Sequence, residues 1–210
     1  MAWLDPHPDP PADWDRELPL KKFKRSWLRI HQLENEPLFF GKSGKNRFDA
    51  PSKEFGVLYA ARDFCGAFIE TLGDLDQYRL IPEYEVAKRG LARIVPARAL
   101  RLVDLSGEGL AQLVADARMT AGDNRALSLK WALWIHRHPQ VPDGIVYRAR
   151  HDQSQACVAL FDRVASDLAV EKLGALADPR HESLLGKALN KYKFALYDSP
   201  PHVGPPAGPV

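Results

Sequence analysis

The sequence predicts an α+β fold, in which short strands and a few amphipathic helices pack around one core. Short apolar runs with β-branched and aromatic residues, as in residues 55–61 and 144–148, are typical of buried strands. Apolar residues recur at helical spacing in residues 64–72 and 124–138, which predicts helices with one buried face. Strands and helices do not alternate regularly along the chain, so this pattern favours α+β over a parallel α/β sheet.

The composition is ordinary for a soluble globular protein. The 210 residues, 45% hydrophobic and 27% charged, suit one domain with a full core. A formal charge of +2 is too small to require a nucleic-acid partner. No apolar run approaches the roughly 20 residues that span a bilayer, and the N-terminus does not resemble a signal peptide. Cys65 and Cys157, the only cysteines, predict no disulfide framework or metal site, and we expect a cytoplasmic protein without a membrane partner.

Proline content divides the chain into three parts. Residues 1–19 are rich in proline and aspartate, and we expect them to be poorly ordered or strap-like. Residues 199–210 form a proline- and glycine-rich tail with nothing to bury, which predicts disorder. The folded domain is therefore expected over residues 20–198.

The first elements of this domain carry basic side chains. Residues 21–25 contain three lysines and an arginine, a cluster more typical of a solvated segment than of a phosphate site. Residues 26–31 predict a strand with Trp27, Arg29 and His31 on one face. An arginine within a core strand indicates either an ion pair or an anion site.

The stretch from residue 46 to residue 72 combines a turn, a strand and a helix. Pro51 predicts a turn over residues 47–51, residues 55–61 predict a buried strand, and Asp63 is placed to cap a helix over 64–72. Glu70 lies on the less apolar side of that helix, where Gly66 and Ala67 would leave open space for a ligand. The alternative is that Glu70 is an ordinary solvated glutamate.

Further strands and helices are expected after this stretch. Residues 84–95, 99–105 and 156–164 are rich in β-forming residues, like 144–148, and helices are expected near 106–117, 124–138 and 181–193. The polar residues 149–155 predict a loop that could line a cleft. His136 and His138 are weak evidence for a metal site.

Taken together, these segments resemble the RES-domain family of bacterial toxins. The resemblance rests on five segments in the order of the family, which cover roughly residues 26–165: Arg29-Ile30, Arg47-Phe48-Asp49-Ala50-Pro51, Phe55-Gly56-Val57-Leu58-Tyr59 with Glu70, Gly144-Ile145-Val146-Tyr147, and Cys157-Val158-Ala159-Leu160-Phe161.

The resemblance implies a fold, an activity and a partner. The fold would be similar to that of ADP-ribosyltransferases, with antiparallel or mixed β-sheets around an NAD cleft and flanking helices. The protein would be the toxin of a type II toxin–antitoxin system and an NAD glycohydrolase, NAD phosphorylase or ADP-ribosyltransferase. NAD would be its substrate, and it would need no cofactor and no metal. Its partner would be a helix-turn-helix (Xre-like) antitoxin, through which alone it would meet nucleic acid; a homo-oligomer stays open.

The resemblance also implies roles for individual residues. Arg29 and Glu70 match the arginine and glutamate of the family and would be catalytic, while Tyr59 matches a tyrosine of the cleft. Ala149 occupies the place where many relatives have a serine, and Ser154, five residues further on, is a candidate to replace that serine. Arg47 either faces the ligand or ties down its own loop.

These residue types suit cleavage of the nicotinamide–ribose bond. Nicotinamide leaves as a neutral molecule, so the main requirement is to stabilise a positively charged, oxocarbenium-like ribose, which a carboxylate such as Glu70 can do. The guanidinium of Arg29 suits the diphosphate, and Tyr59 can stack on the nicotinamide ring. Two alternatives stay open: a catalytically weak NAD-binding interaction module, suggested by Ala149, and an RNA-acting toxin that uses the basic cluster and His31.

Overall fold

The computed structural model describes residues 9–12, 16–73, 79–122 and 124–198. The N-terminal half contains, in order, β1 (Leu20–Phe23), β2 (Trp27–Gln32), β3 (Val57–Ala61), α1 (Phe64–Leu72), β4 (Leu80–Pro82), α2 (Glu83–Ala87), β5 (Arg89–Pro96) and β6 (Leu100–Leu105). The C-terminal half contains α3 (Glu108–Gln112), α4 (Arg118–Ala121), α5 (Arg125–Arg137), β7 (Gly144–Arg148), β8 (Ala156–Phe161), η1 (Asp162–Asp167), β9 (Leu168–Ala175), η2 (Pro179–His181), α6 (Glu182–Tyr192) and β10 (Ala195–Tyr197).

Eight of the strands form one mixed sheet in the order β1-β6-β7-β8-β3-β2-β5-β9. Neighbouring strands in this sheet are antiparallel except β6 and β7, which are parallel. The short strands β4 and β10 pair in parallel as a separate two-stranded sheet. The prediction of an α+β fold is confirmed, with a single eight-stranded sheet as its centre.

The sheet is weakly joined in its middle. β3 and β8 pair over five positions and β2 and β5 over six, whereas β2 and β3 share one register pair, Leu28 with Ala61. Beyond that pair the two strands part. The sheet therefore consists of two halves, β1-β6-β7-β8-β3 and β2-β5-β9, and the candidate site lies where they separate.

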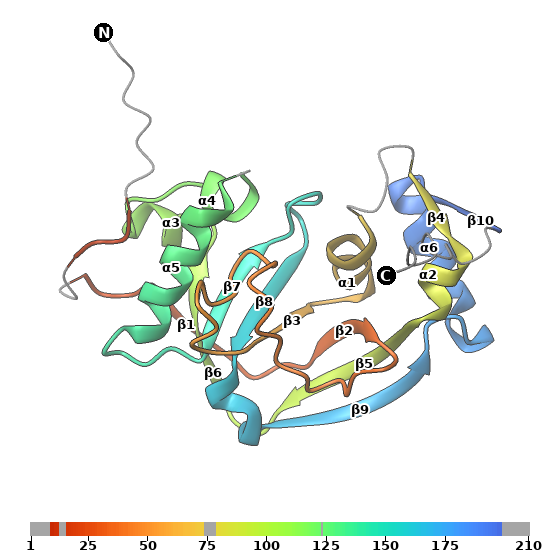
Figure 1. Ribbon diagram of the computed structural model, residues 1–210, viewed down its shortest axis with the longest axis horizontal. Helices are drawn as coiled ribbons and strands as arrows, with labels where there is room; N and C mark the ends of the chain where they lie inside the picture. Colours follow the sequence, from red (N-terminus) through yellow and green to blue (C-terminus); the bar gives the residue numbers. More distant parts are fainter. Residues whose placement is uncertain (1–8, 13–15, 74–78, 123, 199–210) are drawn as a thin grey trace, which may run out of the picture.

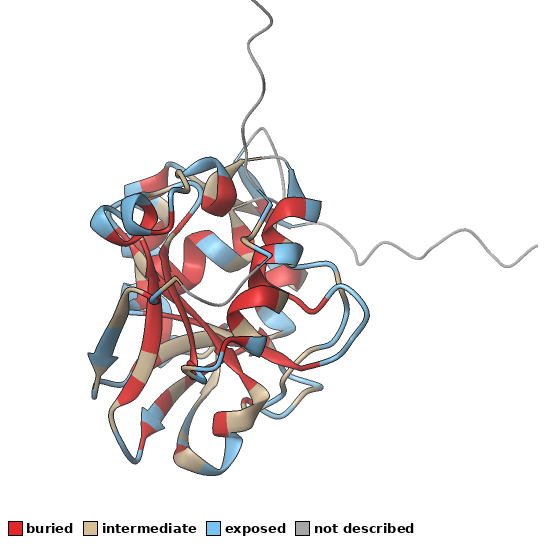
Figure 2. Cartoon of the chain, turned by 90° about the vertical axis from the view of Figure 1, so that its left-hand side faces the viewer, coloured by how far each residue is buried: buried red, intermediate tan, exposed pale blue. Residues whose placement is uncertain are grey.

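The helices are grouped at opposite ends of the sheet (Figure 1). α3, α4 and α5 lie together near β1 and β6, while α2 and α6 lie near the β4–β10 pair, with α1 between the two groups. Apolar side chains on both faces of the sheet are buried, in a larger cluster that includes Phe68 of α1 and Trp131 of α5 and a smaller one around Trp27. Figure 2 shows buried residues along the strands and on the inward sides of the helices.

Part of the predicted N-terminal segment packs on the domain. Leu18 is 4% exposed and belongs to the larger core cluster, and its amide donates to Gln140 Oε1 at 2.8 Å. The guanidinium of Arg16 donates to the carbonyl of Leu113 at 2.6 Å. These contacts place residues 16–19 with the folded domain rather than apart from it. Residues 1–8 and the whole tail 199–210 lie outside the described residues.

Most of the predicted elements exist near their expected bounds. The helix over 64–72 is confirmed as α1, and Asp63 caps it by accepting a hydrogen bond from the amide of Gly66 at 3.0 Å. The strands expected at 26–31, 55–61, 99–105, 144–148 and 156–164 correspond to β2, β3, β6, β7 and β8, and the helices at 124–138 and 181–193 to α5 and α6. In these segments a local pattern and a local boundary signal agree.

Two predictions fail where local patterns mislead. The strand expected at 84–95 begins only at Arg89, because Pro82 starts a short helix with Glu83 and Glu85 in its first turn. The helix expected near 106–117 is limited to α3, because Val114 adopts a left-handed φ of 54°. The basic cluster is solvent-exposed, as expected, and part of it forms edge strand β1, where Lys21 makes an ion pair with the buried carboxylate of Asp104.

Candidate active site

A cavity of about 360 Å³ opens where β2 and β3 part. α1 forms one wall, the loop around Arg47 and the start of α5 form another, and the end of β7 with the loop after it completes the enclosure. Its charged and polar lining side chains are Arg29, Lys45, Asn46, Arg47, Tyr59, Glu70, Thr71, Arg89, Thr120, Arg125, Tyr147, Arg150 and His151. Six of these are arginine or lysine, and within the described residues Glu70 is the one carboxylate among them. The cavity thus presents a single acid surrounded by bases.

Glu70 is held by two hydrogen bonds from distant parts of the chain. Its Oε2 accepts from the hydroxyl of Tyr147 at 2.9 Å, and its Oε1 accepts from the backbone amide of Arg150 at 3.1 Å. The side chain is solvent-accessible from the cavity, yet the surrounding protein raises the pKa of Glu70, an effect that the two hydrogen bonds and nearby His151 and Arg47 oppose. The carboxylate is therefore fixed in orientation and open to the cavity, as a group that acts on a ligand requires.

Tyr147 is a site residue that the sequence analysis did not assign. It lies on β7, is 4% exposed, and packs edge-on against Phe48 with ring centroids 4.9 Å apart. Burial and the adjacent Glu70 carboxylate raise the pKa of Tyr147 well above its usual value, so the phenol stays protonated and donates. In the sequence, the alternation of β7 predicts that Ile145 and Tyr147 share one face of the strand. It does not predict that this face meets α1, so Tyr147 could not be assigned to the site.

The loop over residues 43–50 is organised by the fully buried carboxylate of Asp49. Asp49 accepts from the hydroxyl of Ser43 at 2.9 Å, from the amide of Asn46 at 3.1 Å and from the hydroxyl of Tyr59 at 3.0 Å. The hydroxyl of Tyr59 in turn accepts from the amide of Phe48 at 3.0 Å. Because its hydroxyl is engaged on both sides, Tyr59 presents only its ring to the cavity.

Arg47 extends from this loop toward α5 and the cavity. Its Nη1 donates to the carbonyl of Gly122 at 2.8 Å and lies 3.5 Å from the hydroxyl of Ser128. Burial and nearby Arg150 lower the pKa of Arg47, while Glu70 raises it. Both expected roles of Arg47 thus agree with the geometry, because one side chain ties down its loop and lines the cavity close to Glu70.

Arg29 projects from strand β2, whereas Glu70 projects from helix α1. Side chains alternate along β2, so Arg29 leaves the strand on the side of Trp27, opposite Leu28 and Ile30. Its Nη2 donates to the carbonyl of Phe39 at 3.0 Å, while its Nε and Nη1 are buried without a hydrogen-bond partner. Burial lowers the pKa of Arg29 to about 10. In the described part of the chain Arg29 forms no ion pair, and its two unpartnered nitrogens are closed to solvent, so the ion-pair alternative is not observed and the anion site stays a prediction.

Ala149 and Ser154 lie away from the cavity. Ala149 is fully buried in the larger core cluster, and its amide donates to the carbonyl of Gln155 at 3.0 Å. Ser154 is exposed, and its hydroxyl donates to Asp152 Oδ1 at 2.6 Å. Neither residue lines the cavity, so their predicted contact with a ligand gains no support.

Two other sequence-based interpretations need correction. Gly66 was expected to leave open space beside Glu70, but a Cβ at this position would lie 2.9 Å from the Cβ of Ala61, so Gly66 serves close packing of α1 on β3. His31 was a candidate for RNA chemistry, but it is 8% exposed and its Nδ1 lies 2.8 Å from the carbonyl of Gln32. His31 does not line the cavity, which leaves the RNA-acting alternative without a site there.

The family of this chain follows from sequence comparison. Residues 26–182, which include both strands at the cavity, α1, β7 and the loop that follows, match the RES domain. The chain therefore belongs to the RES-domain family.

Two relatives give this membership a context. Over 100 residues the chain is 32% identical to the probable toxin y4kH of Sinorhizobium fredii (strain NBRC 101917 / NGR234), an alignment that spans 47% of this chain and 76% of the relative. The fold is similar to a chain in the crystal structure of the M. tuberculosis MbcT–MbcA toxin–antitoxin complex, with a TM-score of 0.54, 13% identity, and coverage of 73% and 86% of the two chains. Within the described ranges, no helix is both long and apolar enough to cross a membrane.

Proposed function

We propose that this chain is the toxin of a type II toxin–antitoxin system and that it cleaves NAD at the bond between nicotinamide and ribose. The observation that carries the proposal is the oriented carboxylate of Glu70, which faces a cavity whose other charged side chains are basic. The chain's membership of the RES family, and its similarity to a probable toxin and to a chain of a toxin–antitoxin complex, support the role as a toxin.

Glu70 would stabilise the sugar as nicotinamide departs. The C–N bond breaks with both electrons going to nicotinamide, which leaves neutral, while positive charge develops on the ribose. A carboxylate next to this charge lowers the barrier, and Glu70 is already oriented toward the cavity before the ligand binds. Tyr147 and the amide of Arg150 keep both oxygens of Glu70 directed, so that no reorientation is needed during the reaction.

The basic side chains would hold the diphosphate of NAD. Arg47 lies close to Glu70, and Arg29 would turn its guanidinium, two nitrogens of which are buried without partners, toward a phosphate oxygen when NAD binds. The ring of Tyr59 lines the cavity with its hydroxyl engaged elsewhere, which suits stacking on nicotinamide rather than proton transfer. In this arrangement the parting of β2 and β3 corresponds to the NAD cleft of an ADP-ribosyltransferase-like fold.

The acceptor of the ADP-ribosyl group would be water, inorganic phosphate or a protein side chain. Each attacks the same anomeric carbon and so needs the same charge stabilisation from Glu70. Water also loses one proton in this step, whereas an ionised phosphate or carboxylate oxygen does not. NAD is the substrate, and this cleavage requires no redox or metal step.

A protein partner would keep the toxin inactive in the producing cell, since NAD is shared by all metabolism. We propose a helix-turn-helix antitoxin as this partner. Expression of the toxin alone should deplete cellular NAD and arrest growth, and co-expression of the antitoxin should reverse both effects.

The decisive experiment is Glu70→Gln, with products identified after incubation with NAD in the presence and absence of phosphate. This change keeps the volume and removes the charge, so we expect turnover to fall by about 10²-fold or more, the size typical of the loss of one oriented electrostatic group. Glu34→Gln, at an exposed loop glutamate outside the cavity, is the matched control and should leave turnover unchanged. Full activity in folded Glu70→Gln would remove the basis of the proposal, and NAD binding without turnover in the wild type would favour an interaction module.

A further inference from the structure

The loop between β7 and β8, residues 149–155, connects Glu70 to α6. Near one end of the loop, the amide of Arg150 donates to Glu70 Oε1 at 3.1 Å. Two residues further on, Asp152 Oδ2 accepts from Lys191 Nζ at 2.9 Å and from the hydroxyl of Tyr192 at 2.8 Å. The segment that orients the carboxylate is thus attached to a helix that lies much later in the chain.

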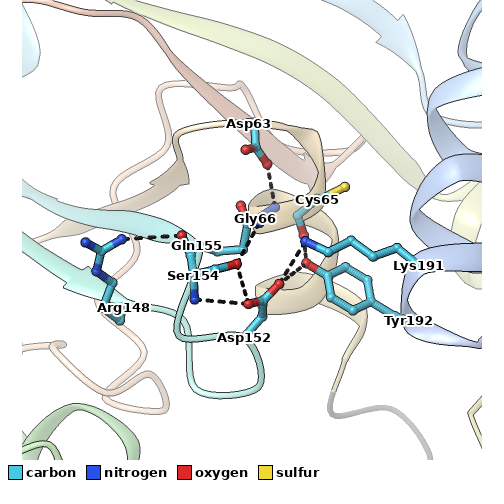
Figure 3. Close-up of polar contacts among 9 residues, drawn as sticks. All are labelled: Asp63, Cys65, Gly66, Arg148, Asp152, Ser154, Gln155, Lys191 and Tyr192. Carbon is cyan, nitrogen blue, oxygen red and sulfur yellow. Dashed lines mark hydrogen bonds and ion pairs between the residues drawn. The ribbon is translucent and has the colours of Figure 1, made fainter.

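Asp152 also stabilises the loop from within. Its Oδ1 accepts from both the amide and the hydroxyl of Ser154, at 3.0 and 2.6 Å. Figure 3 shows the Asp152 carboxylate between Ser154 on one side and Lys191 and Tyr192 on the other. Burial alone would raise the pKa of Asp152, but these hydrogen bonds hold it well below its usual range. The carboxylate is therefore ionised throughout the physiological pH range.

A second contact joins the same loop to the start of α1. With its amide nitrogen turned toward Asp63, Gln155 donates to Asp63 Oδ1 at 2.9 Å and accepts from Lys191 Nζ at 3.0 Å. Asp63 is the residue that caps α1. The ring of Tyr192 lies parallel to that of Phe68 on α1, with centroids 6.1 Å apart. α1, which carries Glu70, the loop and α6 are therefore joined by one polar cluster.

We propose that Asp152 is a positioning residue for Glu70: its bonds to Lys191 and Tyr192 fix the loop so that the amide of Arg150 stays on the carboxylate. Asp152 itself does not line the cavity. The inference rests on the proposed function, because it assigns Asp152 a part in the same reaction. It also makes α6 a contributor to activity without any contact between α6 and the ligand.

The first test is Asp152→Asn, which keeps the size of the side chain and removes its charge. We expect kcat to fall by about tenfold, the effect of one lost hydrogen bond on a transition state, while KM stays within about twofold. The acidic limb of the pH profile should move to higher pH, because Glu70 loses a hydrogen bond that lowers its pKa. The groups that face Glu70, namely Tyr147, Arg150, His151 and Arg47, are unchanged by the substitution. Loss of the negative charge of Asp152 would by itself lower the pKa of Glu70 and move the acidic limb to lower pH. The direction of the shift therefore distinguishes loss of the Arg150 hydrogen bond from loss of the charge.

Further variants separate positioning from folding. Lys191→Met should reproduce the effect of Asp152→Asn, Lys191→Arg should retain activity, and Tyr192→Phe, which keeps the ring packing, should show a smaller loss. Asp178→Asn is the matched control, because Asp178 pairs with Arg180 at the surface, outside the cavity and its loop. This control should match the wild type in kcat and in pH profile.

A measurement without substrate makes the inference independent of NAD chemistry. Hydrogen exchange of the Arg150 amide, followed by NMR, should accelerate by about tenfold or more in Asp152→Asn, as the bond to Glu70 opens more often. If the wild type leaves NAD intact, the proposed function fails, and with it the catalytic part of the inference, while the exchange rate still decides whether Asp152 fixes the loop. Unchanged exchange and an unchanged acidic limb in both Asp152→Asn and Lys191→Met would overturn the inference. So would a lower melting temperature with an unaltered kcat.

Discussion

Two loops meet at the cavity, and an aspartate organises each of them in a different way. In the loop over residues 43–50, Asp49 is fully buried and binds its own loop and the adjoining Tyr59. In the loop over residues 149–155, Asp152 is half-buried and binds Ser154 and the end of α6. The first loop supplies Arg47 to the cavity, and the second supplies the amide that holds Glu70.

Because of this difference, loss of Asp49 should mainly lower the stability of the protein, whereas loss of Asp152 should mainly change the orientation of Glu70. Asp49 forms its hydrogen bonds inside the core, so its loss leaves buried donors unpaired and lowers the free energy of unfolding. Of the partners of Asp152, Ser154 and Lys191 are exposed and can bind water instead, so loss of its charge should release the loop at a smaller cost in stability. On the proposed assignment, aspartate stabilises the fold at position 49 and orients Glu70 from position 152.

Among the variants that test this comparison, Asp49→Asn should have the largest effect, because it breaks the first loop. An amide NH₂ would replace one acceptor opposite Asn46, Ser43 or Tyr59, and we expect a loss of about 2 kcal/mol in the free energy of unfolding. Arg47 and Asn46 would shift from the cavity wall, so KM for NAD should rise by roughly tenfold, as for loss of one charged contact. Thermal melting and steady-state kinetics measure the two effects. An Asp49→Asn protein of unchanged stability, with an altered kcat alone, would show that the two loops do not differ as described.

Tyr147→Phe tests the other hydrogen bond that orients Glu70. The ring and its contact with Phe48 remain, and one donor to Glu70 is lost. We expect kcat to fall by about tenfold, the effect of one hydrogen bond. Because the hydrogen bond from Tyr147 lowers the pKa of Glu70, its loss raises that pKa, and activity at acidic pH should fall more than at neutral pH. A pH–rate profile tests this, and a limb that moves to lower pH would contradict the assigned role.

Ala149→Ser should have the smallest effect on turnover. Ala149 is fully buried in the core and does not line the cavity, so an added hydroxyl cannot reach a ligand there. We expect a loss of about 1 kcal/mol in stability from the buried polar group and no gain in activity. A clear increase in NAD turnover would restore the original assignment of position 149 to the substrate site.

The sequence was most informative where one segment determines its own structure. α1, its cap at Asp63 and the position of Glu70 on it follow from residues 63–72 alone, and all three are confirmed in the structure. The edge strand β9 was not predicted, because its side chains are mostly exposed or half-buried and lack an apolar run. The hydrogen-bond partners of Glu70 could not be predicted from the sequence either, because Tyr147 and the amide of Arg150 approach it only after β7, β8 and β3 pair.

The long separation between Glu70 and its two donors has a consequence during synthesis. The donors lie 77 and 80 residues after the carboxylate, and β3 must wait for β8 before its free edge is paired. A chain that leaves the ribosome from its N-terminus therefore exposes Glu70 early, without the groups that orient it. Pairing over such distances is slow compared with formation of α1 itself. A nascent or prematurely terminated chain that ends before β7 lacks both donors to Glu70, so the site cannot be assembled until β7 and the loop after it have been synthesised.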